Sequence, residues 1–211
     1  MIKSLDVETG EYWFHQDGST TQTLAPEGQQ RKLLYRFIQN WTVMIDGGAW
    51  VGGWARHWSW KFKKVIAIEI DPLNYECLVK NINGFTNITA INACLADRMN
   101  ETRGFEGDKE LKSCIRRTMP DGSVPTLTID SLELPECGFI KLDLQGYDYF
   151  ALKGAAETIS RCKPVVMFEH DPSCYERYGV GRNDPADWLK SLGMTYKDCL
   201  RKDPIWGWNG S

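Results

Sequence analysis

The stretch VMIDGGAWVGG (residues 43–53) decides the fold. Its first three residues are apolar, as in a strand that is buried on both faces, and they lead into Asp46. Glycines follow at positions 47, 48, 52 and 53, and glycine lets a ligand approach the backbone closely at the head of a helix. The stretch therefore predicts a strand, a ligand-binding turn and a helix in direct succession.

The pattern of an apolar run that ends at an acidic residue recurs along the chain. Residues 65–68 precede Glu69, residues 139–142 precede Asp143, and residues 165–168 precede Glu169. Helical spacing of apolar residues fills the intervals, and such alternation is typical of an α/β fold. We expect one domain over residues 1–211, doubly wound, with helices on both faces of a mostly parallel sheet. Such sheets bind ligands at the carboxyl ends of their strands, where these acidic residues fall.

Two regions fit this alternation less well. Residues 1–41 form an N-terminal extension that we expect to be helical, because apolar spacing after Pro26 predicts a helix that ends near Asn40. Residues 98–123 are charged and contain glycine without a clear period, which suggests an irregular excursion or a hairpin over the sheet edge. Its charges favour an exposed position, and both a lid over the site and a peripheral role stay open.

Composition excludes several classes of function. The formal net charge of −3 gives no diffuse cationic field, so nucleic acid is not expected as a partner. No apolar run approaches the roughly 20 residues of a membrane span, and no signal peptide is evident, so we expect a soluble, cytoplasmic protein without membrane contact. The seven cysteines include no CxxC pair, which favours buried, reduced thiols over a disulfide framework or a zinc site.

The residues at the strand ends indicate the kind of ligand. A dinucleotide site requires GxGxxG, but Ala49 stands at the middle glycine position, and the Asp46 carboxylate would repel a pyrophosphate. The same carboxylate suits a ligand that carries an ammonium group and a sulfonium. Glu69 ends the next strand and is positioned to accept hydrogen bonds from two ribose hydroxyls, and Ile70 could cover an adenine face.

Six blocks of sequence resemble the FkbM-type class I methyltransferases. They are IDGGAWVG (45–52), AIEIDP (67–72), NACLAD (92–97), VPTLTIDSL (124–132), IKLDLQG (140–146) and LKGA (152–155). The resemblance implies a seven-stranded, Rossmann-like class I methyltransferase fold and S-adenosylmethionine as the cofactor.

The resemblance also implies roles for individual residues. Asp46, Gly48 and Glu69 would contact the cofactor, with Ala49 in the same turn. The adenine would lie near Ile70, Cys94 and Leu95, and Asp143 near the point of methyl transfer.

The chain departs from the family pattern at two positions. Trp50 stands where the family usually has asparagine, and Gln145 replaces a glutamate. The first change alters the shape of the cavity, and the second removes a charge that could position the substrate or act as a base. Trp54 and Trp58 share a helix face by their spacing, which favours core packing for both.

Methyl transfer from a sulfonium is a direct displacement, so alignment and exclusion of water matter more than covalent chemistry. A hydroxyl acceptor gains from a general base, for which His170, Asp143 and Glu169 are the candidates. We expect His170 to be the base if any side chain is, because it is the histidine at the carboxyl edge of the sheet and an unperturbed imidazole pKa near 6.5 suits proton removal at neutral pH. Asp143 is the next candidate, and a structural, hydrogen-bonded role of His170 is an open alternative. These three residues do not form a spaced ligand motif, so no metal is expected.

Three classes of function are compatible with these patterns. A methyltransferase that acts on a hydroxyl of a small molecule or glycan is favoured. A nucleotide-dependent oxidoreductase is disfavoured by Asp46 and Ala49. A protein that binds S-adenosylmethionine without turnover stays open because Gln145 lacks a charge.

Overall fold

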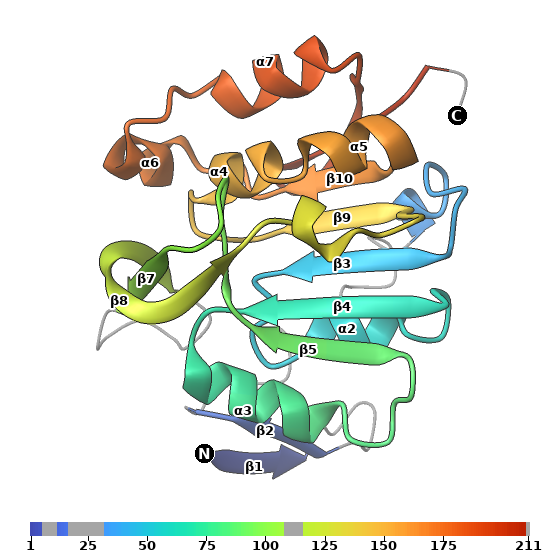
Figure 1. Ribbon diagram of the computed structural model, residues 1–211. Coiled ribbons are helices and arrows are strands. Elements are labelled where there is room, and N and C mark those ends of the chain that lie inside the picture. Colours follow the sequence, from blue (N-terminus) through green and yellow to red (C-terminus); the bar gives the residue numbers. More distant parts are fainter. Residues whose placement is uncertain (6–11, 17–31, 108–115, 210–211) are drawn as a thin grey trace.

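A seven-stranded sheet forms the centre of the protein (Figure 1). The computed structural model describes residues 1–5, 12–16, 32–107 and 116–209. The strand order is β11-β12-β10-β9-β3-β4-β5. Their bounds are β3 (Val43–Gly47), β4 (Lys64–Glu69), β5 (Ile88–Asn92), β9 (Phe139–Leu142), β10 (Val165–Phe168), β11 (Thr195–Leu200) and β12 (Asp203–Gly207). Strands β5, β4, β3, β9 and β10 run parallel, and β12 pairs antiparallel with β10 and β11. The expected seven-stranded, mostly parallel sheet is confirmed.

Helices cover both faces of the sheet, as expected. The helices are α2 (Gly53–Trp58), α3 (Pro72–Asn81), α4 (Asp148–Lys153), α5 (Ala156–Cys162), α6 (Pro172–Tyr175) and α7 (Asp184–Ser191), with short 3-10 turns at Asp130–Leu132 and Glu176–Tyr178. One apolar core joins the sheet to α4, α5 and α7, and a second joins the other face to α2 and α3. In Figure 1, α4 and α5 lie in front of the sheet and α2 lies behind it.

The described part of the N-terminal extension corrects the expectation of a helix. Strand β1 (Ile2–Leu5) pairs antiparallel with β2 (Tyr12–His15). The side-chain amide of Asn81, at the end of α3, bonds both the N–H and the carbonyl of Phe14, so β2 gains partners that a sequence pattern does not reveal. Helical residues appear at 32–34 and give way to a turn by residue 35, so the helix ends before Asn40. Its expected start at Pro26 lies outside the described residues.

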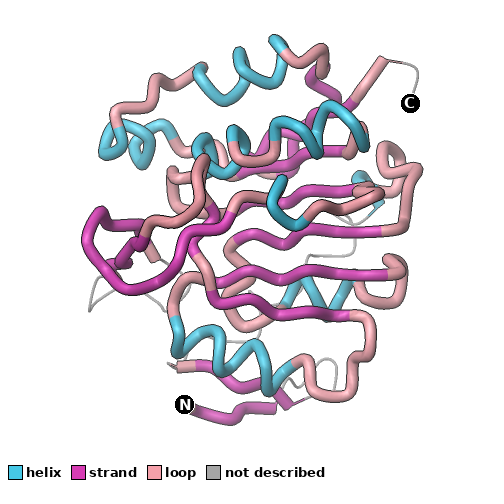
Figure 2. The backbone as a smooth tube through the Cα atoms, in the orientation of Figure 1, coloured by secondary structure: helices cyan, strands magenta, loops and turns pink. Residues whose placement is uncertain are grey.

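The region 98–123 has the form of the hairpin alternative. Strand β7 (Thr102–Glu106) pairs antiparallel with β8 (Arg117–Leu127), and β8 also pairs parallel with β6 (Cys94–Leu95). Figure 1 shows this hairpin on the side of the sheet at which the arrowheads of β3, β4 and β5 end, and Figure 2 shows the same arrangement as a tube. The hairpin is therefore positioned next to the carboxyl ends of these strands.

None of the described helices is long and apolar enough to cross a membrane. The expectation of buried, reduced thiols holds for part of the described cysteines. The described cysteines are free thiols, and Cys77, Cys94 and Cys137 are buried. Cys199 is exposed, however, so burial does not extend to every thiol.

Candidate functional site

A pocket opens at the carboxyl ends of β3, β4 and β9. Its walls come from the glycine turn after β3, from α2, from the residues after β4 and β5, and from the start of β8. The lining residues are Gly48, Ala49, Trp50, Gly53, Trp54, Ile68, Glu69, Ile70, Asn74, Ala93, Cys94, Leu95, Arg116, Thr118, Lys141, Asp143, Leu144 and Gln145. This is the edge at which parallel α/β sheets bind their ligands.

The glycine turn brings two strand ends into direct contact. Gly48 has φ +70°, in the left-handed region, and a Cβ built there would lie 2.0 Å from the carbonyl oxygen of Asp143. The N–H groups of Gly48 and Ala49 both donate to the carbonyl of Ile68, at 3.0 Å each. Glycine is therefore required at position 48 both for backbone conformation and for the close approach of the loop that carries Asp143.

Glu69 presents a buried carboxylate to the pocket. The N–H of Trp50 donates to Oε2 at 2.8 Å, and the N–H of Asp71 donates to Oε1 at 3.0 Å. Burial raises the pKa of Glu69 to about 7, against the opposing effect of these two backbone bonds. The Asn74 side chain also bonds this carboxylate. A carboxylate offers about four acceptor sites, so Glu69 has acceptor capacity left for a ligand hydroxyl.

Ile70, Cys94 and Leu95, the residues expected near an adenine, lie together on the pocket wall. Cys94 and Leu95 are buried. Burial raises the pKa of the Cys94 thiol to about 11, so it stays neutral and serves as an apolar surface.

Asp46 lies beneath the pocket wall rather than on it. It is fully buried and forms an ion pair of 3.1 Å between its Oδ1 and Nζ of Lys141. The two residues are register partners in the parallel pair of β3 and β9, which sends both side chains to the same face of the sheet. Lys141 lines the pocket and Asp46 does not, so the charge that reaches the pocket here is positive.

Sequence reasoning missed Lys141. It sits in the apolar run 139–142, where it reads as an interruption of a buried strand. The available signal was its place two residues before Asp143, because alternation puts both on one side of the strand. The core packing expected for Trp54 and Trp58 is confirmed, since Trp58 is fully buried and Trp54 packs against the same core. Trp54 lines the pocket as well, which the sequence did not indicate.

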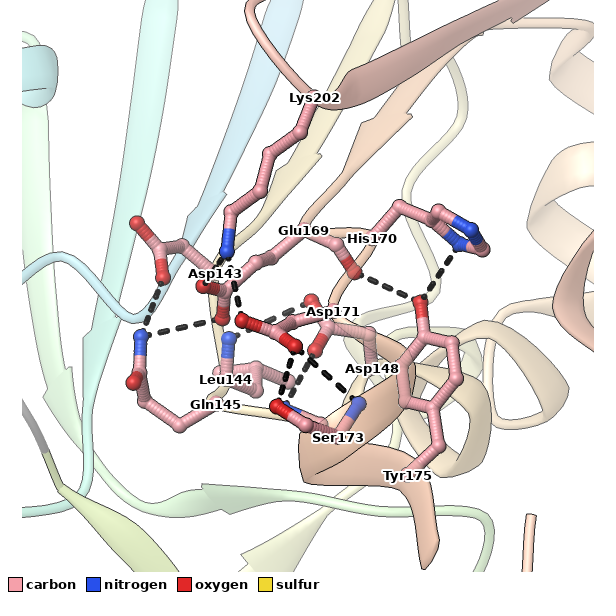
Figure 3. Close-up of polar contacts among 11 residues, drawn as sticks. Asp143, Leu144, Gln145, Asp148, Glu169, His170, Asp171, Ser173, Tyr175 and Lys202 are labelled. Atoms are coloured by element: carbon pink, nitrogen blue, oxygen red, sulfur yellow. Dashed lines mark hydrogen bonds and ion pairs between the residues drawn. The ribbon is translucent and has the colours of Figure 1, made fainter. Parts of the chain in front are cut away.

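Asp143 and Gln145 line the pocket, and Gln145 links Asp143 to Glu169, the residue that follows β10 (Figure 3). The amide Nε2 of Gln145 donates to Oδ1 of Asp143 at 3.1 Å and to Oε2 of Glu169 at 3.0 Å. A glutamate at position 145 would add a third acceptor-only group to this pair of carboxylates. Gln145 therefore bridges two acidic residues that would otherwise repel each other.

Glu169 and His170 follow β10 and are not among the pocket-lining residues. Burial and the nearby charges of Asp143 and Asp148 raise the pKa of Glu169 to about 8, although Lys202 opposes the rise. The His170 Nδ1 lies 3.3 Å from the hydroxyl of Tyr175, and Figure 3 shows the imidazole turned away from Asp143. Burial, together with Arg182, lowers the pKa of His170.

Asp71 joins two chain segments next to Glu69. Its Oδ2 accepts from Nε2 of Gln16 at 3.0 Å and from Nε of Arg116 at 2.6 Å, while Oδ1 caps α3 at the N–H of Leu73. Arg116 lines the pocket. The N-terminal strands and the hairpin thus meet at one carboxylate beside the site.

Most of the expected site residues line this one pocket. Gly48, Ala49, Glu69, Ile70, Cys94, Leu95 and Asp143 line it, whereas Asp46 lies behind Lys141 and His170 lies outside. Within residues 1–5, 12–16, 32–107 and 116–209, no three His, Cys, Asp or Glu side chains are grouped so that they could hold a metal ion.

Comparison with known proteins gives a family match. The family model described as the methyltransferase FkbM domain matches residues 46–199. A search of curated proteins found no significant match. Among solved structures, the methyltransferase FkbM from Methylobacillus flagellatus is 21% identical with a TM-score of 0.51, over 78% of this chain and 42% of that one.

A second solved structure matches over a greater length. The precorrin-6y C5,15-methyltransferase from Geobacter metallireducens is 14% identical, with a TM-score of 0.56 and a coverage of 93% of both chains. At these identities the structural matches support the fold alone. This chain spans less than half of the FkbM protein from Methylobacillus flagellatus.

Proposed function

The chain belongs to the FkbM methyltransferase family, and from this premise we propose that it transfers a methyl group from S-adenosylmethionine to a hydroxyl oxygen of a small molecule or glycan. S-adenosylmethionine is the cofactor that this family of methyltransferases implies. The oxygen acceptor, the lack of a nucleic acid partner and a cytoplasmic location remain predictions from the sequence.

One observation carries the proposal. A single pocket combines the glycine turn, the buried Glu69 carboxylate, an apolar wall and Asp143. An adenosyl group joined to an amino acid needs these surfaces in one cavity: acceptors for ribose hydroxyls, an apolar slot for a purine and a backbone without side-chain bulk.

The residues present fit the cofactor. Glu69 would accept hydrogen bonds from the ribose hydroxyls, since its carboxylate has acceptor capacity beyond the two backbone bonds and the side-chain bond with Asn74. Ile70, Cys94 and Leu95 would hold the adenine. The turn at Gly48 and Ala49 would lie along the amino-acid chain. The bound cofactor supplies a methyl group activated by a positively charged sulfur.

The acceptor side of the proposal centres on Asp143. As the new bond from acceptor oxygen to methyl carbon forms and the sulfur–carbon bond breaks, the hydroxyl proton must pass to a base or to water. Asp143 is the candidate that lines the pocket, and Gln145 orients it through a hydrogen bond of 3.1 Å. We rank His170 and Glu169 after Asp143 because both follow β10 outside the pocket lining.

Binding without turnover is the second candidate. The neutral amide of Gln145 occupies the position at which the family resemblance expects a glutamate, and it engages both neighbouring carboxylates. If the missing charge is essential for catalysis, the pocket would hold the cofactor and transfer nothing.

Two measurements test the proposed function. Mass spectrometry of the ligand that copurifies with the protein should find S-adenosylmethionine or S-adenosylhomocysteine, and a nicotinamide nucleotide would instead indicate an oxidoreductase. A panel of hydroxyl acceptors with labelled methyl donor should then give an O-methylated product. Cofactor binding without label transfer to any acceptor would favour the binding protein, and an N-methylated product would contradict the oxygen acceptor.

A further inference from the structure

Lys141 places a buried ammonium group on the wall of the pocket. Its side chain is 7% exposed, and its Nζ lies 3.1 Å from Oδ1 of Asp46 and 3.1 Å from the carbonyl oxygen of Gly48. The Trp54 ring, which also lines the pocket, has its centroid 5.8 Å from the same nitrogen. The ammonium therefore lies between the glycine turn and the first residues of α2.

The Lys141 side chain stays charged. Burial alone would lower its pKa, but the charges of Asp46 and Asp143 outweigh burial and raise the pKa above the usual value. A buried ion pair gains little over two apolar residues of similar volume, because desolvation of both charges offsets their attraction. A lysine and an aspartate at this point in the sheet are thus poorly explained by fold stability alone.

One contact of the ammonium is weak enough to be exchanged for a better acceptor. An ammonium group donates three hydrogen bonds. Asp46 is its ion-pair partner at 3.1 Å and the Gly48 carbonyl accepts at 3.1 Å, whereas the bond to the Gly47 carbonyl is long, at 3.5 Å, beyond the usual range for a good N–H···O bond. An anionic group in the pocket could take this third bond.

The arrangement of charges in the pocket indicates which anionic group Lys141 would bind. The proposed nucleoside end of the pocket has the Glu69 carboxylate and an apolar wall of Ile70, Cys94 and Leu95. Lys141 lies away from this end, on β9, where its ammonium group bonds the carbonyl of Gly48. The cofactor of the proposed function carries one carboxylate, at the end of its amino-acid chain remote from the ribose. Its ammonium group would be repelled by Lys141, so the attraction expected between that ammonium and Asp46 is screened by the lysine.

We infer that Lys141 binds the carboxylate at the amino-acid end of S-adenosylmethionine, with Asp46 as the residue that positions the lysine. This inference rests on the proposed function. It assigns Asp46 an indirect role through the 3.1 Å ion pair, in place of direct contact with the cofactor.

The test compares two ligands that differ in this carboxylate. Calorimetry measures the dissociation constants of S-adenosylmethionine and of decarboxylated S-adenosylmethionine, which keeps the adenosine, the sulfonium and the amine. A charge-assisted bond in a partly desolvated site should give the unmodified protein a preference of about tenfold or more for the carboxylate-bearing ligand.

The variants remove the pair as a unit so that no buried charge is left alone. The double variant Asp46→Asn with Lys141→Met should bind the two ligands about equally, and Asp46→Asn with Lys141→Gln serves if the first does not fold. The matched control is Asp97→Asn with Lys153→Met, which removes an ion pair of 3.2 Å whose residues do not line the pocket. The control should keep the full preference.

Each outcome decides the inference. Binding of neither ligand by the unmodified protein would overturn the proposed function and the inference with it. Binding of S-adenosylmethionine without a preference, or a preference that survives in a folded Lys141 variant, would overturn the inference and leave the proposed function standing. Because each result is a ratio of two ligands on one protein, a general loss of stability does not mimic it.

Discussion

Glu69 makes cofactor binding depend on pH near neutrality. Its pKa is raised to about 7, so the carboxyl is mostly neutral at pH 6 and mostly ionised at pH 8. Ribose hydroxyls donate to the ionised form, which therefore is the form that binds. We expect the affinity for S-adenosylmethionine to rise about five- to tenfold from pH 6 to pH 8, in proportion to the ionised fraction. Calorimetry across this range measures the effect.

The control for this titration is Glu69→Gln. The amide has nearly the same shape and does not ionise, while the ionisable groups of the ligand are unchanged. The variant should bind more weakly than the parent at pH 8 and should lack the rise due to position 69. A pH profile identical in parent and variant would show that another group titrates.

Single residues differ in how far the sequence predicts them. Glu69 was expected at the pocket because it ends an apolar strand, and parallel sheets bind their ligands at the carboxyl ends of their strands. The role of Lys141 depends on Asp46, which lies on a neighbouring strand 95 positions earlier in the chain. Strand order is a tertiary property, so no local pattern could pair these two residues. The orientation of His170 likewise depends on Tyr175, which α6 brings to its ring.

At the level of elements, the turn between β3 and α2 requires glycine at position 48. Gly48→Ala would put a Cβ 2.0 Å from the Asp143 carbonyl and force alanine into the left-handed region. We expect a loss of about 3 kcal/mol or more in the free energy of unfolding, since both strain and a backbone clash act. Denaturant unfolding measures this loss.

Gly84→Ala separates the two causes. Gly84 has φ +96°, but nothing lies within 4 Å of a Cβ built there, so strain acts without the clash. This variant should lose only about 1–2 kcal/mol. Equal losses at the two positions would mean that the strand ends move apart easily and that the contact between Gly48 and Asp143 is not a constraint.

Elements were predictable where their own sequence carries the pattern. The strands β3, β4, β9 and β10 are short apolar runs, and all four sit in the sheet as expected. Strand β2 could not be predicted in the same way. It has one buried apolar residue, Trp13, and its backbone depends on the side chain of Asn81 in α3. Tertiary contacts, rather than local periodicity, decide its conformation.

At the scale of the whole molecule, the alternation of strands and helices in the sequence was enough to predict the layered fold. It did not predict how the peripheral segments contact one another beside the site. Strand β3 lies between β4 and β9, so the chain extends the sheet in both directions from β3. The N-terminal strands and the β7–β8 hairpin lie far apart in sequence, yet Gln16 and Arg116 both donate to Asp71. Neither the sequence around Gln16 nor the sequence around Arg116 predicts that both residues bond to Asp71.

This junction should control how the segments around the pocket move and how fast the cofactor leaves. Asp71→Asn keeps a good N-cap for α3, because asparagine caps as well as aspartate, but it removes the charge that pairs with Arg116. The pair is largely buried, with exposed fractions of 15% for Arg116 and 2% for Asp71, so its loss should be felt more than that of a surface pair. We expect faster amide hydrogen exchange at the start of β8 and cofactor dissociation faster by about tenfold, equivalent to about 1.4 kcal/mol.

The control is Asp187→Asn, which makes the same change of charge in an exposed pair with Lys190 on α7. An exposed pair contributes little, so exchange at β8 and cofactor dissociation should match the parent. If Asp71→Asn left both rates unchanged in a folded protein, Asp71 would act only as the cap of α3. Faster exchange with unchanged dissociation would mean that the hairpin moves independently of the site. The expected combination, faster exchange and faster release, would make the ion pair between Asp71 and Arg116 a link that holds the hairpin against the cofactor pocket.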